Sequence, residues 1–357
     1  MFLLVLLLLQ HSQGFNTDDC QALGTPRSKC IVEAMDGVLE KHIEDLEQWV
    51  EEMSPYWTEN MIYDSNWTPN GDFGNSSSLE EWYYSEHIPY IHAFENVSYA
   101  TIIWIGDENS ASLIAYGKSR WRGDLGTIPG QDHAGVEVTI WDLDFYRIDD
   151  AEEAISYNWC LIDFVDLMRQ LGYQVLPKPA LKEGLMFPPA AMDGIPAPVS
   201  RLVSSVDTEI SLDLVSALLY DDFVLGDVPS PIWAQDMVWY GGAGFGMATS
   251  KDEYEEHMLG PLRAGLSQRE LQLDMLLCEG VYCGAHGYLA AMHTGQWLGE
   301  QPTGLPIRLR FALHWRVDPA HTMVRECWAM FDLPAAFNMI GVNLFARMDE
   351  NHYIGHQ

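Results

Sequence analysis

Basic side chains are scarce in this chain. Its 357 residues include 19 Lys and Arg against 52 Asp and Glu, which gives a formal net charge of −33. Binding to nucleic acid or to an anionic membrane surface depends on clustered Lys and Arg. We therefore expect no nucleic-acid partner, and we interpret the acidity as a solvated surface suited to a salty or calcium-containing medium.

Long apolar runs and metal-binding motifs are also lacking. The run Met1–Leu9 is too short to span a bilayer and is followed by small residues up to Gly14, which is typical of a secretory signal peptide. We predict a signal peptide at 1–14 and a secreted or lumenal mature chain without membrane insertion; an uncleaved anchor is the alternative. Neither a zinc-type pair of cysteines nor a His-Glu-x-x-His motif occurs, so we expect no metal and no cofactor.

The few cysteines and the sequons fit a secretory route. Six cysteines are too few for a disulfide scaffold but suit an oxidising compartment. Cys20 with Cys30 is the first predicted disulfide and Cys278 with Cys283 the second, whereas Cys160 and Cys327 are expected as buried thiols. Glycosylation is predicted at the three Asn-x-Ser/Thr sites, which are Asn66, Asn75 and Asn96.

The chain contains an internal duplication. The stretch Trp159–Asp163, with a glycine nine residues later, recurs as Trp328–Asp332 with the same spacing, and Trp57–Tyr63 recurs as 233–239. Each half is therefore expected to be a complete module. The predicted boundaries are an arm at 15–30, a first domain at 31–175, a Pro-rich linker at 176–206 and a second domain at 207–350.

Each half has helical patterns first and strand patterns afterwards. Apolar residues from Ile31 to Met53 fall at helical spacing and predict one long helix, and the second half opens alike from about Asp207 to Phe223. Second helical stretches are expected to end near Pro89 and Pro261, before a succession of strands. This order predicts an α+β fold with helices packed on one face of a curved antiparallel sheet.

The segment His293–Gly304 resembles the hairpin of SnoaL-like proteins, the polyketide-cyclase and ester-cyclase branch of the nuclear transport factor 2-like superfamily. The closing Trp-x-x-x-Asp strands and Gln170–Gly172 resemble that family's last strand and tail. The resemblance covers both modules. It implies two tandem cone-shaped α+β barrels, each enclosing a deep and mostly apolar pocket, and ring-closing chemistry in which an Asp acts as acid and base without a cofactor.

Strand alternation suggests where such an Asp would act. Trp159, Leu161 and Asp163 share one face of their strand, and the second half repeats this face as Trp328, Met330 and Asp332. If that face lines the pocket, burial would raise the pKa of the carboxyl toward the range of acid/base catalysis. The alternative is that Asp163 and Asp332 only cap the helices that follow. The expected pocket residues are Trp328, Met330, Trp239, Tyr240, Trp159, Leu161 and Tyr63.

His293 is the second catalytic candidate, since it matches the hairpin's histidine and could exchange protons near neutral pH; the alternative is a hydrogen-bonded core residue. The alignment puts Gly117 at its place in the first module, so we expect the second module to be the catalytic one. His286 is expected to be exposed and His314 to lie at a rim or on the surface. The glycine-rich run 241–246 is expected to cover the pocket mouth, and the acidic run 142–153 to form a solvated turn.

Three functions remain open at this point. The first is cofactor-free cyclisation, isomerisation or hydrolysis of a hydrophobic small molecule. The second is a non-catalytic carrier of such a molecule. The third is a scaffold in which the two modules pair as a covalent pseudo-dimer.

Overall fold

The computed structural model of the chain describes Cys20 and residues 25–66, 74–123, 125, 128, 134–191, 203–225 and 228–348. The predicted signal peptide at 1–14 lies outside these residues. The two predicted disulfides, Cys20–Cys30 and Cys278–Cys283, are both formed, and Cys160 and Cys327 are buried free thiols.

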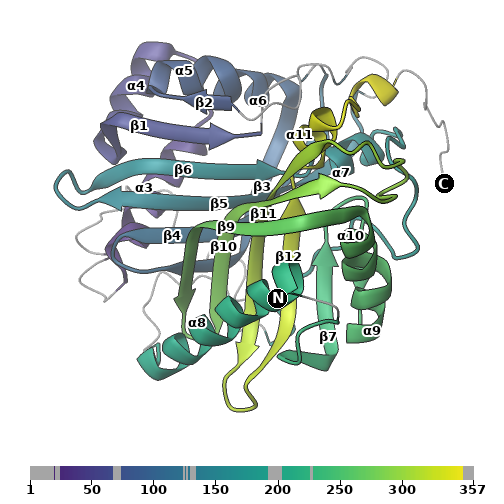
Figure 1. Ribbon diagram of the computed structural model, residues 1–357. Helices are drawn as coiled ribbons and strands as arrows, with labels where there is room; N and C mark the ends of the chain where they lie inside the picture. Colours follow the sequence, from purple (N-terminus) through teal and green to yellow (C-terminus); the bar gives the residue numbers. More distant parts are fainter. Residues whose placement is uncertain are drawn as a thin grey trace.

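Two domains follow each other along the chain, and their elements have the same order from the first strand to the helix after the last strand (Figure 1). The first comprises α3 (Arg27–Leu39), α4 (Leu46–Met53), η1 (Ser54–Tyr56), β1 (Trp57–Ser65), β2 (Gly74–Ser76), α5 (Leu79–Trp82), η2 (Tyr83–His87), α6 (Ile88–Ala93), β3 (Phe94–Gly106), β4 (Ser110–Trp121), β5 (Glu137–Asp149), β6 (Ala154–Ile162) and α7 (Phe164–Gln170). The second comprises α8 (Ser205–Tyr220), η4 (Asp221–Leu225), β7 (Trp233–Gly241), β8 (Met247–Ala248), α9 (Lys251–Tyr254), η5 (Glu255–Leu259), α10 (Gly260–Gly265), β9 (Leu266–Glu279), β10 (Tyr282–His293), β11 (Pro306–Asp318), β12 (Met323–Phe331), α11 (Leu333–Met339) and η6 (Ala346–Met348).

Each domain is built on one six-stranded sheet, with strand orders β2-β1-β6-β5-β4-β3 and β8-β7-β12-β11-β10-β9. Most neighbours are antiparallel, but β1 and β6, and likewise β7 and β12, run parallel, so each sheet is mixed. Trp159 pairs with Phe145 and Asp64, and Trp328 pairs with His314 and Tyr240 at the corresponding places. The α+β prediction and the alignment of the two closing strands are therefore confirmed.

The opening helix of the first domain differs from the prediction. Instead of one helix over 31–53, α3 ends at Leu39 and α4 begins at Leu46. The break contains His42 in a left-handed backbone conformation (φ 50°). The side chain of Asp45 accepts a hydrogen bond from the backbone N–H of Gln48 and starts a new helix. Periodicity alone missed this stop because the apolar spacing continues across it.

The second helical stretches also differ, since both run past their proline. A π-helical turn, η2 or η5, precedes Pro89 or Pro261, and the chain continues in α6 to Ala93 and in α10 to Gly265. Proline lacks an N–H and its ring presses on the preceding turn of an α-helix. The wider π turn accommodates both effects, and such turns are frequent at functional sites.

The convex faces of the two sheets pack on each other. In Figure 1 the strands of the second sheet run across those of the first. A separate apolar cluster fills this contact, including Trp159 and Leu161 from the first domain and Tyr240, Trp328 and Met330 from the second. Each sheet is therefore covered on both sides, by its own helices on the concave face and by the other domain on the convex face.

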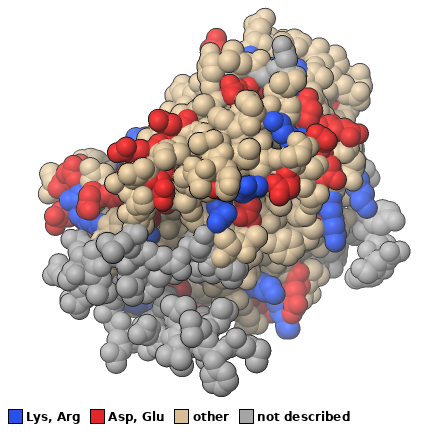
Figure 2. Space-filling model, turned by 90° about the horizontal axis from the view of Figure 1, so that it is seen from below, with Lys and Arg blue, Asp and Glu red and all other residues tan. Residues whose placement is uncertain are grey.

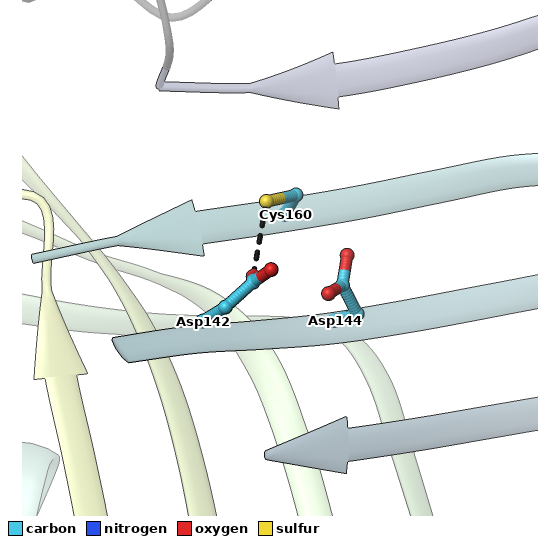
Figure 3. A group of neighbouring side chains, drawn as sticks. All are labelled: Asp142, Asp144 and Cys160. Carbon is cyan, nitrogen blue, oxygen red and sulfur yellow. Dashed lines mark hydrogen bonds between the residues drawn. The ribbon is translucent and has the colours of Figure 1, made fainter. Parts of the chain in front are cut away.

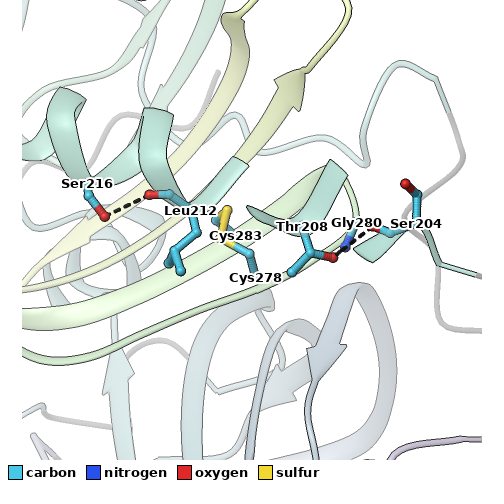
Figure 4. Close-up of a disulfide and its surroundings, with 7 residues drawn as sticks. All are labelled: Ser204, Thr208, Leu212, Ser216, Cys278, Gly280 and Cys283. Atoms are coloured by element: carbon cyan, nitrogen blue, oxygen red, sulfur yellow. Dashed lines mark hydrogen bonds between the residues drawn. A yellow bond between two sulfur atoms is a disulfide. The ribbon is translucent and has the colours of Figure 1, made fainter. Parts of the chain in front are cut away.

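The hairpin β9–β10 and the linker make further contacts with the second domain. Its hairpin β9–β10 carries the Cys278–Cys283 disulfide, and the backbone N–H of Gly280 in its turn donates to Thr208 Oγ1 of α8 at 2.8 Å (Figure 4). The linker residues 176–191 lie irregularly along this domain: Lys182 pairs with Met247, and the indole N–H of Trp328 donates to the carbonyl of Phe187 at 2.7 Å. Within the described residues, no helix has the length and apolar character needed to cross a membrane.

Candidate functional site

A cavity of about 200 Å³ lies inside the concave face of the first domain. Its wall is formed by the inner faces of β1 and β3–β6, and it is closed by α3 on one side and by η2 and α6 on the other. The side chains that line it include carboxyls from three of these elements, namely Asp36, Glu86, Asp142 and Asp144. The cavity therefore holds an acidic cluster among apolar and aromatic side chains, whereas the sequence predicted a mostly apolar pocket.

Asp142 and Asp144 are the centre of this wall (Figure 3). They stand two residues apart on β5, so both side chains point to the same face of the sheet. Cys160 on β6 donates from Sγ to Asp142 Oδ1 at 3.2 Å, and Asn158 donates from Nδ2 to Asp144 Oδ1 at 2.9 Å. The neighbouring strand thus fixes the position of each carboxyl through one hydrogen bond.

The two carboxyls hold protons with different strength. Burial raises the pKa of Asp142 well above its usual range, and the negative charge of Asp144 together with the hydrogen bond between the two raises it further. Burial also raises the pKa of Asp144, but the hydrogen bonds that it accepts from Asp142 and Asn158 lower it. Asp142 is therefore the group that keeps the shared proton, and Asp144 is the first to ionise.

Glu86 enters the cavity from the π turn η2 and is the second acidic centre. Its carboxylate accepts hydrogen bonds from Tyr63 Oη and from Ser65 Oγ, the latter at 3.0 Å. Burial raises the pKa of Glu86 to about 8, although these two hydrogen bonds lower it. On the opposite side, burial raises the pKa of Asp36 on α3, and neighbouring carboxyls, Asp144 among them, add to this rise.

Asp142, Asp144 and Cys160 could also offer three ligand atoms to a metal, since these atoms lie within 4.8 Å of one another. A ligating thiol or carboxyl must be deprotonated. Burial raises the pKa of the Cys160 thiol and of both carboxyls, so the site favours protons over a cation bound by these three groups alone.

Of the predicted pocket residues, only Tyr63 lines this cavity. Trp159, Leu161, Tyr240, Trp328 and Met330 are all buried in the apolar cluster between the two sheets, and Trp239 lies in the core of the second domain. The alternation along β6 and β12 is as predicted, but the face chosen for the pocket is the convex one. The concave face of β6 carries Cys160 instead.

Asp163 and Asp332 are both helix caps. Asp163 accepts from the backbone N–H of Asp166 at 2.9 Å and begins α7, and Asp332 accepts from that of Ala335 at 3.2 Å and begins α11. Asp163 also accepts from the backbone N–H of Ala243 at 2.8 Å. Burial and the charge of Asp166 raise the pKa of Asp163 to about 7, yet neither cap lines the cavity.

The glycine-rich run 241–246 forms a buried turn against this cap and does not cover the pocket mouth. The backbone N–H of Gly242 donates to the carbonyl of Ala329 at 3.0 Å. Gly244 and Gly246 have φ of 88° and 84°, which favours glycine at both positions. The turn therefore joins the two domains beside Asp163.

His293 and Asp332 do not form one site. His293 is buried at the end of β10, where its Nδ1 lies 3.1 Å from Thr303 Oγ1 and its backbone bonds to Leu305. The backbone N–H of Asp332 donates to the carbonyl of Arg310 at 3.0 Å. Arg310 comes five residues after Leu305, which corresponds to about 17 Å at 3.4 Å per strand residue. The residue equivalent to His293 is Trp121 and not Gly117. His293 ends β10 and pairs with Leu266, the first residue of β9, and Trp121 ends β4 and pairs with Phe94, the first residue of β3.

The second domain fills the place of the cavity with apolar side chains. The strand registers make Phe311, Leu313 and Trp315 the counterparts of Asp142, Asp144 and Tyr146. All three are at most 2% exposed and belong to the core cluster of their domain. This cavity therefore belongs to the first domain and not to the second module, which the sequence favoured.

Three surface predictions are also wrong. His286 and His314 are fully buried between the sheets, where His286 stacks on Trp159 with ring centroids 4.7 Å apart and His314 Nε2 lies 2.8 Å from Ser112 Oγ. Asn66 is buried and its Nδ2 donates to the carbonyl of Ile162 at 2.8 Å, so this sequon is part of the fold. Asn75 and Asn96 are exposed.

Asp142 and Asp144 were missed because the acidic run was assigned to a turn. The turn begins only after Asp149, and the segment before it is β5. A usable signal was present in the sequence. Two carboxyls with strand spacing interrupt an otherwise apolar strand, and buried carboxyls of this kind are rare without a partner or a function.

Comparisons with known proteins give likenesses to solved structures only. No protein family model matches the chain, and no curated protein matches it. A protein from Streptomyces antibioticus described as a polyketide cyclase is 19% identical, with a TM-score of 0.33, over 37% of this chain and 99% of its own. A protein from Jannaschia described as a SnoaL-like polyketide cyclase is 14% identical, with a TM-score of 0.34, over 40% of this chain and 99% of its own. A protein with a ketosteroid isomerase-like fold from Catenulispora acidiphila, in complex with trimethylamine, is 12% identical, with a TM-score of 0.31, over 37% of this chain and 95% of its own.

Proposed function

We propose that the first domain holds a small molecule in its concave cavity and moves a proton to and from it without a cofactor. Cyclisation, isomerisation and hydrolysis are the reaction types that such chemistry serves. The observation that carries the proposal is the pair of Asp142 and Asp144, two cavity-lining carboxyls on one strand whose pKa values are pushed apart.

The pair supplies an acid and a base side by side. Asp144, which ionises first, takes a proton from the carbon next to a substrate carbonyl, and Asp142 donates its own proton to the carbonyl oxygen to give an enol. Positioned acid/base groups of this kind typically contribute about 10²- to 10⁴-fold to a rate. The bonds from Cys160 and Asn158 hold both groups in place during the exchange.

The test uses exchange of carbon-bound hydrogen in D₂O, because the substrate need not be known in advance. A panel of small ketones and β-ketoesters is incubated with the full chain, and loss of the α-proton signal is followed by NMR. We expect the protein to accelerate exchange for at least one member, and Asp144→Asn to reduce that rate by about two orders of magnitude or more. Asp332→Asn is the control, because Asp332 caps α11 in the second domain and does not line the cavity. It should leave the exchange rate unchanged.

If folded Asp144→Asn and Asp142→Asn proteins exchange the α-proton as fast as the original, the pair has no acid/base role. If the panel binds with no exchange at all, the cavity belongs to a carrier and the proposed chemistry is wrong.

We further propose that the second domain acts as the covalent partner of a pseudo-dimer. The contacts that support this role are polar as well as apolar: Lys29 of the first domain pairs with Glu279 of the second at 3.0 Å, and Asp64 with Arg310 at 3.5 Å. Strands β1 and β4–β6 form the cavity wall on their other face, so this packing stiffens the site from behind. Cleavage of the chain between the two domains should leave the two fragments associated. Separation of the fragments without denaturant would refute the role.

We propose finally that the mature chain is secreted or lumenal, which its two disulfides support. Sequencing the amino terminus of the protein from eukaryotic cells should place the first residue near Phe15, and a retained Met1 would contradict the proposal.

A further inference from the structure

The charge inside the cavity is of one sign. Four carboxyls project into it from three sides, namely Asp36 on α3, Glu86 on η2, and Asp142 and Asp144 on β5. Glu33 and Glu40 line it as well. Among the described residues that line the cavity none is Lys or Arg, and the groups that could become positive are His42 and His87.

The basic residues of α3 and the histidine of η2 are engaged in other contacts. On α3, Arg27 bonds to Asn109 and Asp150 outside the cavity, and Lys29 pairs with Glu279 of the second domain. His87 uses Nε2 to contact the carbonyl of Ile43 at 2.8 Å, and burial lowers the pKa of its ring. Even on the outer surface in Figure 2, acidic side chains lie beside most of the basic ones. Asp36, Glu86, Asp142 and Asp144 therefore have no Lys or Arg beside them among the described residues of the cavity wall.

Aromatic rings complete the wall. Tyr63, Trp82, Tyr90, Tyr99 and Tyr146 line the cavity, and the Tyr99 hydroxyl donates to that of Tyr90. The face of an aromatic ring carries negative potential and attracts an organic cation, most strongly where water is excluded. Rings and carboxyls thus select for the same ligand charge.

The fold does not require these carboxyls. The counterparts of Asp142 and Asp144 in the second domain are Phe311 and Leu313, and the equivalent of Glu86 is Met258, all buried in an apolar core. Burying several carboxyls near one another opposes folding unless they are protonated or paired. A feature that costs stability and is built into only one of two equivalent domains indicates a ligand that pairs with it.

We propose that the cavity of the first domain binds a small organic cation, an amine or a quaternary ammonium group, seated between the Asp142–Asp144 pair and Glu86 with tyrosine rings around it. This inference rests on the proposed function, because it names the substrate class for the same site. The cavity of about 200 Å³ is smaller than the roughly 300–1,000 Å³ that is typical of sites for drug-sized ligands. The ligand is therefore about the size of a short amine.

Binding of a cation should release protons. Burial raises the pKa of each of the four carboxyls, so the empty cavity favours a partly protonated cluster over a fully ionised one. A bound positive charge favours their ionised forms and lowers these pKa values again. By linkage, the affinity of a cation rises with pH, by up to about tenfold per unit for each proton released.

The experiment compares cations with neutral molecules of the same shape by isothermal titration calorimetry on the full chain. Choline is paired with 3,3-dimethylbutan-1-ol, and benzylammonium with benzyl alcohol. We expect at least one cation to bind about tenfold or more tightly than its neutral partner. Repeating the titration in buffers of different ionisation enthalpy should show proton release for that cation.

Variants locate the effect. Asp142→Asn and Glu86→Gln should each weaken the binding of the cation about tenfold and leave the neutral partner within twofold. Asp213→Asn removes one exposed charge from α8 of the other domain and should change neither affinity by more than about twofold, which separates the cavity from the overall charge.

The inference is overturned if neither cation binds more tightly than its neutral partner, or if Asp213→Asn weakens the cation as much as the cavity variants do. The comparison on the unmodified chain stands even where a variant fails to fold. Cation binding without α-proton exchange would remove the acid/base proposal only, and exchange without a preference for cations would remove this inference only.

Discussion

Replacing Glu86 by Gln should stabilise the first domain at high pH and not at low pH. The folded-state pKa of Glu86 is about 8 against an ordinary value of 4.5, mainly because the side chain is desolvated in the cavity wall. The folded protein thus keeps a proton that the unfolded chain has lost. The stability of the folded state therefore falls as pH rises from about 4.5 to about 8.

The size of the effect follows from the two pKa values. A rise from 4.5 to about 8 corresponds to roughly 4 to 5 kcal/mol over the whole window. The effective dielectric constant of a protein site is higher than that of a dry interior, so we expect about 3 kcal/mol of pH-dependent destabilisation to disappear in Glu86→Gln. The variant also weakens the hydrogen bonds from Tyr63 and Ser65, at about 1 kcal/mol each. The net change is a loss of about 1 to 2 kcal/mol at pH 4.5 and a gain of about 1 to 2 kcal/mol at pH 8.

Urea unfolding followed by tryptophan fluorescence at pH 4.5, 6 and 8 measures this difference. Glu80→Gln, at an exposed position on α5, is the matched control and should give a small change that does not depend on pH. A Glu86→Gln protein whose change in unfolding free energy is the same at all three values would refute the reasoning, since the carboxyl would then not hold a proton in the folded state.

Three other outcomes follow from the structure. Asp332→Ala should lower the free energy of unfolding by about 1 kcal/mol through loss of the helix cap, whereas Asp332→Asn should be nearly neutral in thermal melts. In protein from eukaryotic cells, Asn75→Gln or Asn96→Gln should change the glycosidase mobility shift, and Asn66→Gln should not. Burial lowers the pKa of His286 to about 3, so the stability of the folded state should fall as pH drops below about 6.5. His286→Phe should remove about 2 kcal/mol of that loss at pH 5 in urea unfolding. An unchanged pH dependence would contradict the buried neutral state of His286.

The sequence alone determined the features that depend on local order. Repeated anchors revealed two domains and alternation marked β6 and β12. An Asp before a short helix indicated a cap as the alternative to a catalytic role for Asp163 and Asp332, and both caps form. The two disulfides join cysteines only ten and five residues apart. Each of these features depends on periodicity or on short separation, which a single sequence displays.

Only the tertiary structure decided which face of each sheet holds a cavity and which domain keeps it open. Alternation separates the two faces of a strand, but here both faces are buried, because the convex faces pack against each other. The sequence therefore predicted Trp159 in the pocket, although it packs between the sheets. It predicted Asp142 in a solvated turn, although this residue lines the cavity. Side-chain volume made the final distinction, since Phe311 and Leu313 fill in the second domain the space that two carboxyls leave open in the first.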